Sequence, residues 1–179
     1  ALSTRPDLVK KEWLEELTKL QDSLPPFDHN LALKIFEEEI GQPTARIFEY
    51  FPDEPIASAS LGQVYKARID SNYWVAVKIQ RPNLKHIIRR DLVFIRALCW
   101  ILGPFLPLNL GFGLDEIIDE FGESLFNEID YEKEADNAEK FSTLFKNNGT
   151  IVVPRVERFI SSRKVITTSW IEGTKLRDK

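Results

Sequence analysis

The spacing of apolar residues changes along the chain from a helical period to a strand period and back again. Near the start, apolar positions recur at helical spacing over residues 6–20 and 28–40, which predicts two helices. Asp28 and Gly41 are residue types that begin and end helices, so the second helix is expected between them. Alternating patterns, with a turn between the last two, then predict strands at residues 47–51, 63–69 and 73–79.

Helical spacing returns after Pro82, where an apolar stripe faces a basic side. Pro104 and Pro107 mark a loop, and Asp115 is expected to cap a further helix that leads into the acidic residues 128–137. The tail returns to strand patterns at residues 151–160 and 164–169. The whole pattern predicts an α+β fold with an antiparallel sheet of about five strands.

Composition narrows the class of protein without naming a function. A hydrophobic content of 43% with 29% charged residues is typical of a globular protein, and a net charge of −4 argues against nucleic-acid binding. The single Cys99 excludes an internal disulfide, and the isolated His29 and His86 lack metal-ligand spacing, so no metal site is predicted. The most apolar stretch, residues 92–114, contains prolines and an arginine that a membrane-spanning helix would not readily tolerate.

A loop of small residues followed by a lysine-bearing strand is the first candidate for chemistry. Lys78 stands sixteen residues after Gly62 and shares a strand face with Ala76, while the neighbouring valines point the other way. Backbone N–H groups of such a loop can bind phosphate, and the lysine adds a compact positive charge. The predicted nucleotide loop comprises Ile56, Ala57, Ser58, Ala59, Ser60, Leu61, Gly62, Gln63 and Val64.

Two interpretations of this loop stay open. In the first, Ala57 and Ala59 narrow a phosphate cradle, because their Cβ atoms restrict the positive φ angles that glycine permits. In the second, the stretch is only a small-residue turn before a strand. The spacing to Lys78 favours the cradle.

The acidic segment supplies a candidate partner for Lys78. Asp130, Glu134 and Asn137 are spaced so that they project from one helix face. A lysine withdrawn from water needs a carboxylate partner, since an unpaired buried charge is costly, and we predict an ion pair between Lys78 and Glu134. The alternative, a solvated helix face rich in carboxylates, stays open.

Together these stretches resemble the UbiB family of atypical kinase-like proteins, also called aarF-domain kinases. The resemblance covers essentially the whole chain and rests on residues 2–8, 19–22, 25–27, 56–64, 75–82, 126–137 and 170–173. It implies a protein-kinase-like N-lobe at residues 46–179 after a helical extension at residues 1–45. In that lobe, a C-type helix, the helix that carries the glutamate partner of the lysine, comes after the third strand. One further helix is inserted between that strand and the C-type helix.

The resemblance also assigns roles to single residues. Lys78 would contact the ATP phosphates as a catalytic residue, with Glu134 as its ion-pair partner, and Ala76 would line the nucleotide site. The gatekeeper position and the backbone facing adenine would lie at the hinge between the lobes, at Thr168, Ser169 and Ile171.

Some parts of the family pattern are missing from this sequence. Glu128 and Asp130 would form the family's Glu-x-Asp motif, but the upstream Lys-x-Gly-Gln lysine that this motif engages is absent. The chain has no methionine, opens on Ala1 and stops soon after the expected hinge, so we expect an excised piece of a longer protein. Mg²⁺ would accompany ATP with its ligands in the second lobe, and the isolated chain is expected not to turn over ATP.

The function implied by the resemblance is an ATP-binding N-lobe of an atypical kinase or ATPase that supports isoprenoid-quinone metabolism. Membrane association is implied, in a plastid or cyanobacterium, or otherwise in mitochondria or bacteria. The alternative is a non-catalytic, pseudokinase-like module that recruits lipid, quinone or protein partners. Nucleotide binding that depends on Lys78 would distinguish the two.

Overall fold

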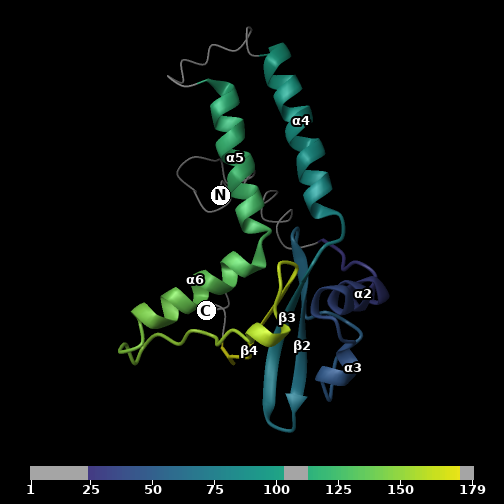
Figure 1. The fold of residues 1–179 in the computed structure, drawn as a ribbon, viewed down its shortest axis with the longest axis vertical. Helices are drawn as coiled ribbons and strands as arrows, with labels where there is room; N and C mark the ends of the chain where they lie inside the picture. Colours follow the sequence, from purple (N-terminus) through teal and green to yellow (C-terminus); the bar gives the residue numbers. More distant parts are fainter. Residues whose placement is uncertain (1–23, 103–112, 174–179) are drawn as a thin grey trace, which may run out of the picture.

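A four-stranded antiparallel sheet organises residues 24–102 and 113–173, the part of the chain that this computed structural model describes. The strands follow each other in the sheet in chain order, so each new strand lies next to the previous one (Figure 1). The turn between the two long strands is closed by the Asn72 N–H, which donates to the Asp70 side chain. The four strands are β1 Ala57–Ser58, β2 Gly62–Asp70, β3 Tyr73–Gln80 and β4 Val165–Ser169.

Two stretches that were predicted as strands do not form regular strands. Residues 44–47 form the short helix α3 (Thr44–Ile47), and residues 48–51 contribute a single bridge, from Tyr50 to Arg68. Residues 151–160 likewise contribute one bridge, at Val156, and end in the 3₁₀ helix η3 (Arg158–Ile160). Pro43, Pro52 and Pro154 explain the interruptions, because proline lacks the N–H that a ladder requires.

The helix predicted after Asp28 is confirmed as α2 (His29–Ile40). The Asp28 side chain accepts from the Leu31 N–H, and Gly41 ends the helix in the left-handed region at φ 78°. The helix predicted over residues 6–20 and the loop at Pro104 and Pro107 lie outside the described residues.

Three longer helices follow the third strand. The sequence predicted two helices there, one inserted helix and one C-type helix. The three helices are α4 (Leu84–Leu102), α5 (Leu114–Glu128) and α6 (Tyr131–Leu144). Gly113 occupies the N-cap of α5, so the prediction that Asp115 caps it is wrong; Asp115 lies in the first turn, where a carboxylate complements the helix dipole. The acidic segment is split, because Asp130 caps α6 just after α5 ends.

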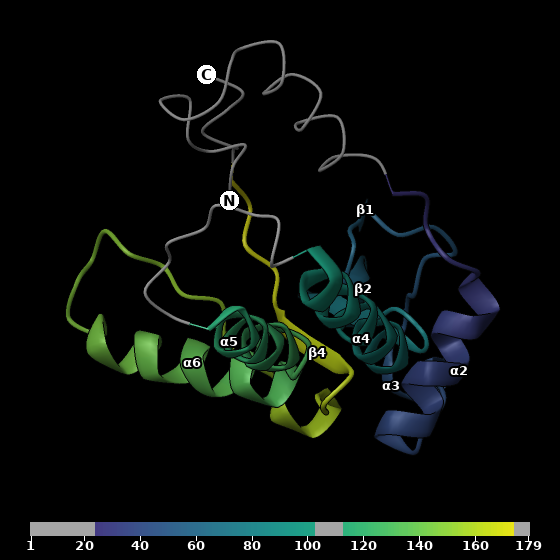
Figure 2. The ribbon, with the colours of Figure 1, turned by 90° about the horizontal axis from the view of Figure 1, so that it is seen from above.

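The two faces of the sheet are covered by different helices (Figure 2). On one face, Ala32, Ile35 and Phe36 of α2 share a buried core with the side chains of Tyr65, Ala67, Val75, Val77 and Ile79. On the other face, α6 buries Tyr131 and Ala135 against Ile166. Since α2 shares its core with the sheet, residue 45 does not separate two cores; the division of the chain at that residue stays a prediction.

Helices α4 and α5 form an antiparallel pair that projects away from the sheet (Figure 1). Gly122 permits their close approach, since a Cβ at this position would lie 3.0 Å from Leu92 Cδ1. At the base of the pair, Leu84, Ile88 and Ile129 form a separate small core. The side chain of Gln80 donates to the Ile129 carbonyl at 2.5 Å and ties this base to the end of β3.

We predict that Gly62→Ala destabilises the fold by about 2 kcal/mol, because an added Cβ overpacks a filled space. The new atom would lie 2.5 Å from the Ile79 carbonyl oxygen and 2.8 Å from the Tyr131 hydroxyl. Gly149→Ala is the control, since a Cβ added at residue 149 would meet no atom within 4 Å and the φ of Gly149 is not positive. Urea unfolding checks both variants, and equal midpoints would contradict the packing role of Gly62.

Candidate nucleotide site

Strand register brings several predicted nucleotide residues onto one face of the sheet. Val64 on β2 pairs with Lys78 on β3, and Ala76 on β3 pairs with Thr168 on β4. Directly paired residues of antiparallel strands share a face, and Ala76 and Lys78 are two positions apart. All four side chains therefore lie on the face opposite the α2 core, where α6 also packs.

The predicted ion pair between Lys78 and Glu134 is formed. Lys78 Nζ lies 3.0 Å from Glu134 Oε1 and 2.7 Å from Oε2, which joins β3 to α6. The side chains are 31% and 45% exposed, so the pair contributes at most about 1 kcal/mol to stability. Its consequence is geometric: the carboxylate orients an ammonium group that has three N–H donors, leaving a donor for a further acceptor.

The ring of Tyr131 packs against the Lys78 ammonium of this ion pair. The ring is fully buried, and Lys78 Nζ lies 4.5 Å from the ring centroid in a cation–π contact. The hydroxyl donates to the Leu61 carbonyl of the loop at 3.5 Å. Burial, with a smaller contribution from the charge of Glu134, raises the pKa of the Tyr131 hydroxyl, so the group stays neutral beside the carboxylate.

The small-residue loop is a tight hairpin between β1 and β2. Ala57 and Ser58 pair with Val64 and Gln63, and the Ala59 N–H closes the turn on the Gly62 carbonyl at 2.8 Å. None of residues 56–64 has a positive φ, so alanine is compatible with this backbone. Gly62 is required by its close approach to β3 and Tyr131 rather than by its φ angle.

Arg81, which the sequence analysis did not single out, fastens this loop. Its guanidinium donates to the Ala59 carbonyl at 2.9 Å, to Ser58 Oγ at 3.0 Å and to the Pro25 carbonyl at 2.8 Å. Its backbone N–H donates to the Leu61 carbonyl. The sequence offered one signal for this role: an arginine directly after the strand that carries Lys78 and directly before Pro82. A guanidinium group can donate to several carbonyl oxygens at once.

The structure does not direct every predicted loop residue toward the site. Gln63 is fully buried, and its side chain accepts from the Phe27 N–H at 3.0 Å and donates to the Tyr65 hydroxyl. It therefore ties the segment before α2 to the sheet. Ile56, Ala57, Ala59 and Ser60 are exposed, while Leu61 is half-buried.

The residues predicted to form the hinge, Thr168, Ser169 and Ile171, lie at the end of β4 and just beyond it. The Ser169 N–H donates to the Arg155 carbonyl and its hydroxyl accepts from the Arg155 N–H, so both groups are engaged within the lobe. Ile171 is 40% exposed just beyond the strand. The predicted contact of these two backbones with adenine stays a prediction.

The segment of residues 170–172, which is predicted to belong to the hinge, is also connected to the sheet through Lys66. Lys66 Nζ lies 2.9 Å from Glu172 Oε1 and 4.4 Å and 5.2 Å from the ring centroids of Trp170 and Trp74. The hydrogen bonds from Lys66 and Trp170 hold the pKa of the Glu172 carboxyl below its usual value. A lysine between two tryptophans thus positions residues 170–172.

The residues of the predicted Glu-x-Asp motif, Glu128 and Asp130, lie at the junction of α5 and α6, and their joint role stays a prediction. Glu128 ends α5 and lines an open hollow of about 740 Å³ together with Lys78, Glu134, Leu61, Ser124, Asn127, Lys133, Asp136, Asn137 and Lys140. Asp130 caps α6 and lines a different hollow, next to Ile129 and Arg163. Within residues 24–102 and 113–173, no group of three or more His, Cys, Asp or Glu side chains is arranged to hold a metal ion.

A lysine-bearing third strand, a glutamate on a helix packed against the sheet and a loop over the same face define a protein-kinase-like N-lobe. A family model described as the ABC1 atypical kinase-like domain matches residues 19–179, and the chain belongs to this family.

Relatives of the chain occur in a cyanobacterium and in chloroplasts. The chain is 50% identical over 178 residues to an uncharacterised protein of Synechocystis, covering 99% of this chain and 31% of that protein. It is 42% identical to the chloroplastic protein ACTIVITY OF BC1 COMPLEX KINASE 1 of Arabidopsis thaliana, covering 99% of this chain and 26% of that protein. The chain thus spans less than a third of the length of these relatives.

A solved structure has the same fold. A Mycobacterium tuberculosis protein in complex with erythromycin is 31% identical and superposes with a TM-score of 0.71, covering 99% of this chain and 44% of that one. The expected kinase-like N-lobe of the aarF-domain family is therefore confirmed.

We predict that Arg81→Ala speeds amide hydrogen exchange at Ile56 and Ala59 about tenfold, because the loop loses two hydrogen bonds from a charged donor and its connection to Pro25. Exchange within β4 should stay unchanged. Arg90→Ala is the control, since the side-chain hydrogen bonds of Arg90 within the described part of the chain go only to its neighbour Asp91. Unchanged loop exchange in Arg81→Ala, measured by mass spectrometry or NMR, would contradict this role.

Proposed function

We propose that this N-lobe binds ATP as part of an atypical kinase or ATPase. The Lys78–Glu134 ion pair carries the proposal, because it holds an ammonium group at the face that the loop of residues 56–64 borders. Protein kinases use a lysine and glutamate in this arrangement to orient the ATP phosphates. The ABC1 family membership supports the same class of activity.

The residues present fit a nucleotide in distinct ways. Lys78 would bind phosphate oxygens with the donor that Glu134 leaves, and the hairpin fastened by Arg81 would border the phosphates. The small Ala76 side chain and Thr168 leave room for the base on the same face. When bound, Mg²⁺ would neutralise phosphate charge, and we place its ligands in the part of the longer protein that follows the hinge.

Lys78→Ala in the full-length protein is expected to weaken binding of a non-hydrolysable ATP analogue with Mg²⁺ at least about tenfold, since one charge-assisted phosphate contact is lost. Calorimetric or fluorescence titration measures the affinity. Lys34→Ala is the matched control, because Lys34 also pairs with a glutamate but lies exposed on α2. Equal affinities for the wild type and Lys78→Ala would exclude the proposed phosphate site.

We further propose a role in isoprenoid-quinone metabolism at a membrane of a plastid or cyanobacterium. The cyanobacterial and chloroplastic relatives support the compartment, and the family resemblance supports the metabolic role. No helix in residues 24–102 and 113–173 is long and apolar enough to cross a membrane.

A genetic experiment tests this metabolic role. In a strain that lacks the gene, prenylquinone content is expected to fall and to be restored by the wild-type protein but not by Lys78→Ala. Unaltered prenylquinone content in the deletion strain would remove the metabolic proposal while leaving nucleotide binding intact.

A second candidate function, recruitment of lipid, quinone or protein partners without catalysis, is favoured by one observation. The pair α4–α5 exposes several large apolar side chains, among them Val93, Phe94, Trp100, Ile101 and Phe121, with Trp100 82% exposed. Contiguous exposed apolar residues are typical of interaction surfaces. Binding of such partners without any Lys78-dependent nucleotide binding would favour this function over the first.

A further inference from the structure

Helix α6 carries Glu134 but is weakly held by apolar packing. Its two buried side chains, Tyr131 and Ala135, lie in its first turn and a half. Further along, Phe141 is 46% exposed and Leu144 is 80% exposed. Burial therefore holds one face of the beginning of α6 and leaves its remaining turns to other contacts.

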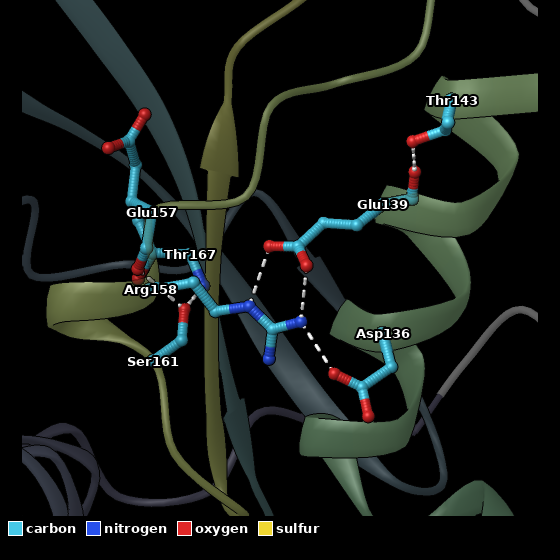
Figure 3. A network of polar contacts seen from close by, with 7 residues as sticks. All are labelled: Asp136, Glu139, Thr143, Glu157, Arg158, Ser161 and Thr167. Atoms are coloured by element: carbon cyan, nitrogen blue, oxygen red, sulfur yellow. Dashed lines mark hydrogen bonds and ion pairs between the residues drawn. The ribbon is translucent and has the colours of Figure 1, made fainter.

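Arg158, on the sheet side of α6, forms ion pairs with two carboxylates in the middle of that helix (Figure 3). Its Nε and one terminal nitrogen donate to the two Glu139 oxygens at 2.6 and 2.7 Å, and the same terminal nitrogen donates to Asp136 Oδ1 at 2.6 Å. A two-pronged arginine–carboxylate contact fixes orientation as well as distance. Hydrogen bonding from Arg158 holds the pKa of the Glu139 carboxyl below its usual value.

The segment that carries Arg158 is firmly attached to β4. The Glu157 N–H donates to the Thr167 carbonyl at 2.8 Å, and Thr167 Oγ1 donates to the Ile160 carbonyl at 2.8 Å. Ser161 Oγ donates to the Glu157 carbonyl and accepts from the Thr167 N–H (Figure 3). Ile160 itself is 1% exposed in the core, so Arg158 extends from a rigid base.

The two tethers of α6 act on different sides of the helix. At about 100° per residue, Asp136 and Glu139 lie roughly 200° and 140° around the helix axis from Glu134. Lys78 holds one side and Arg158 holds the other. A helix held by ion pairs on two opposite sides resists rotation about its own axis as well as displacement from the sheet.

We propose that Arg158 is a positioning residue that keeps α6 in the orientation in which Glu134 reaches Lys78. The inference rests on the proposed function where it concerns nucleotide affinity, but the docking of α6 can be measured without nucleotide. Exposed ion pairs are individually weak, and the side chains of Arg158, Asp136 and Glu139 are 43%, 56% and 49% exposed. The expected effects are therefore several-fold rather than total.

The first experiment follows α6 in the nucleotide-free full-length protein. Arg158→Ala should speed amide exchange about fivefold over residues 136–144 while exchange in β3 stays unchanged. Arg90→Ala, which removes an equal charge at an exposed position, should leave α6 unchanged. Unaltered exchange of α6 in Arg158→Ala, in a variant with normal melting, would overturn the proposal.

A double-mutant cycle separates this contact from a general loss of charge. Glu139→Gln alone should also speed exchange in α6, and Arg158→Ala combined with Glu139→Gln should be no worse than Arg158→Ala, because both remove the same interaction. Fully additive effects would contradict a direct Arg158–Glu139 contact.

Nucleotide titration then links the contact to the site. Affinity for the ATP analogue should fall about fivefold in Arg158→Ala, and unchanged affinity despite faster α6 exchange would overturn the link between the contact and the site. If the wild type binds no nucleotide while Arg158→Ala still loosens α6, the proposed function fails and the positioning role stands.

Discussion

Much of the site depends on the way Tyr131 fills the space between helix α6 and the sheet. Its buried ring lies beneath the Lys78 ammonium, and its hydroxyl reaches the backbone of the loop at the point where Gly62 has no side chain. Three components of the site therefore meet at one aromatic residue: the strand with the lysine, the loop and the helix with the glutamate. The ion pair between Lys78 and Glu134 is short because this packing sets the separation of the strand and the helix.

Around this centre, polar side chains connect elements that the hydrophobic cores leave separate. Gln63 joins the segment before α2 to β2, and Gln80 joins the end of β3 to the junction of α5 and α6. Arg81 joins the loop both to β3 and to Pro25. Each uses side-chain groups to bind backbone groups, which restrains a backbone position without requiring a complementary side chain. The lobe therefore has several short restraints close to the sheet face that carries Lys78.

The sequence predicted the elements whose signals are local and regular. Asp28 and Gly41 bounded α2, and the alternation at residues 73–79 placed Lys78 on the correct face, because caps and strand periods depend only on near neighbours. The Lys78–Glu134 pair was also predicted, with the spacing of a kinase-like lobe as the guide. Residues 47–51 and 151–160 were mistaken for strands, since apolar residues near prolines can pack on a sheet without joining its ladder. Arg81 and Tyr131 were missed, because their importance arises from contacts with residues distant in the chain.

The short junction between α5 and α6 gives the projecting helix pair a mechanical relation to the site. Only Ile129 and Asp130 separate the two helices, and Gln80 fixes the Ile129 carbonyl to β3, so this point is a pivot. Helix α4 has 19 residues and is about 28 Å long, and α5 runs back along it to the pivot. A force on the far end of this arm would act as a torque on the first turn of α6, the turn that carries Glu134. The pair α4–α5 is thus connected, through a two-residue junction, to the turn that holds the carboxylate facing Lys78.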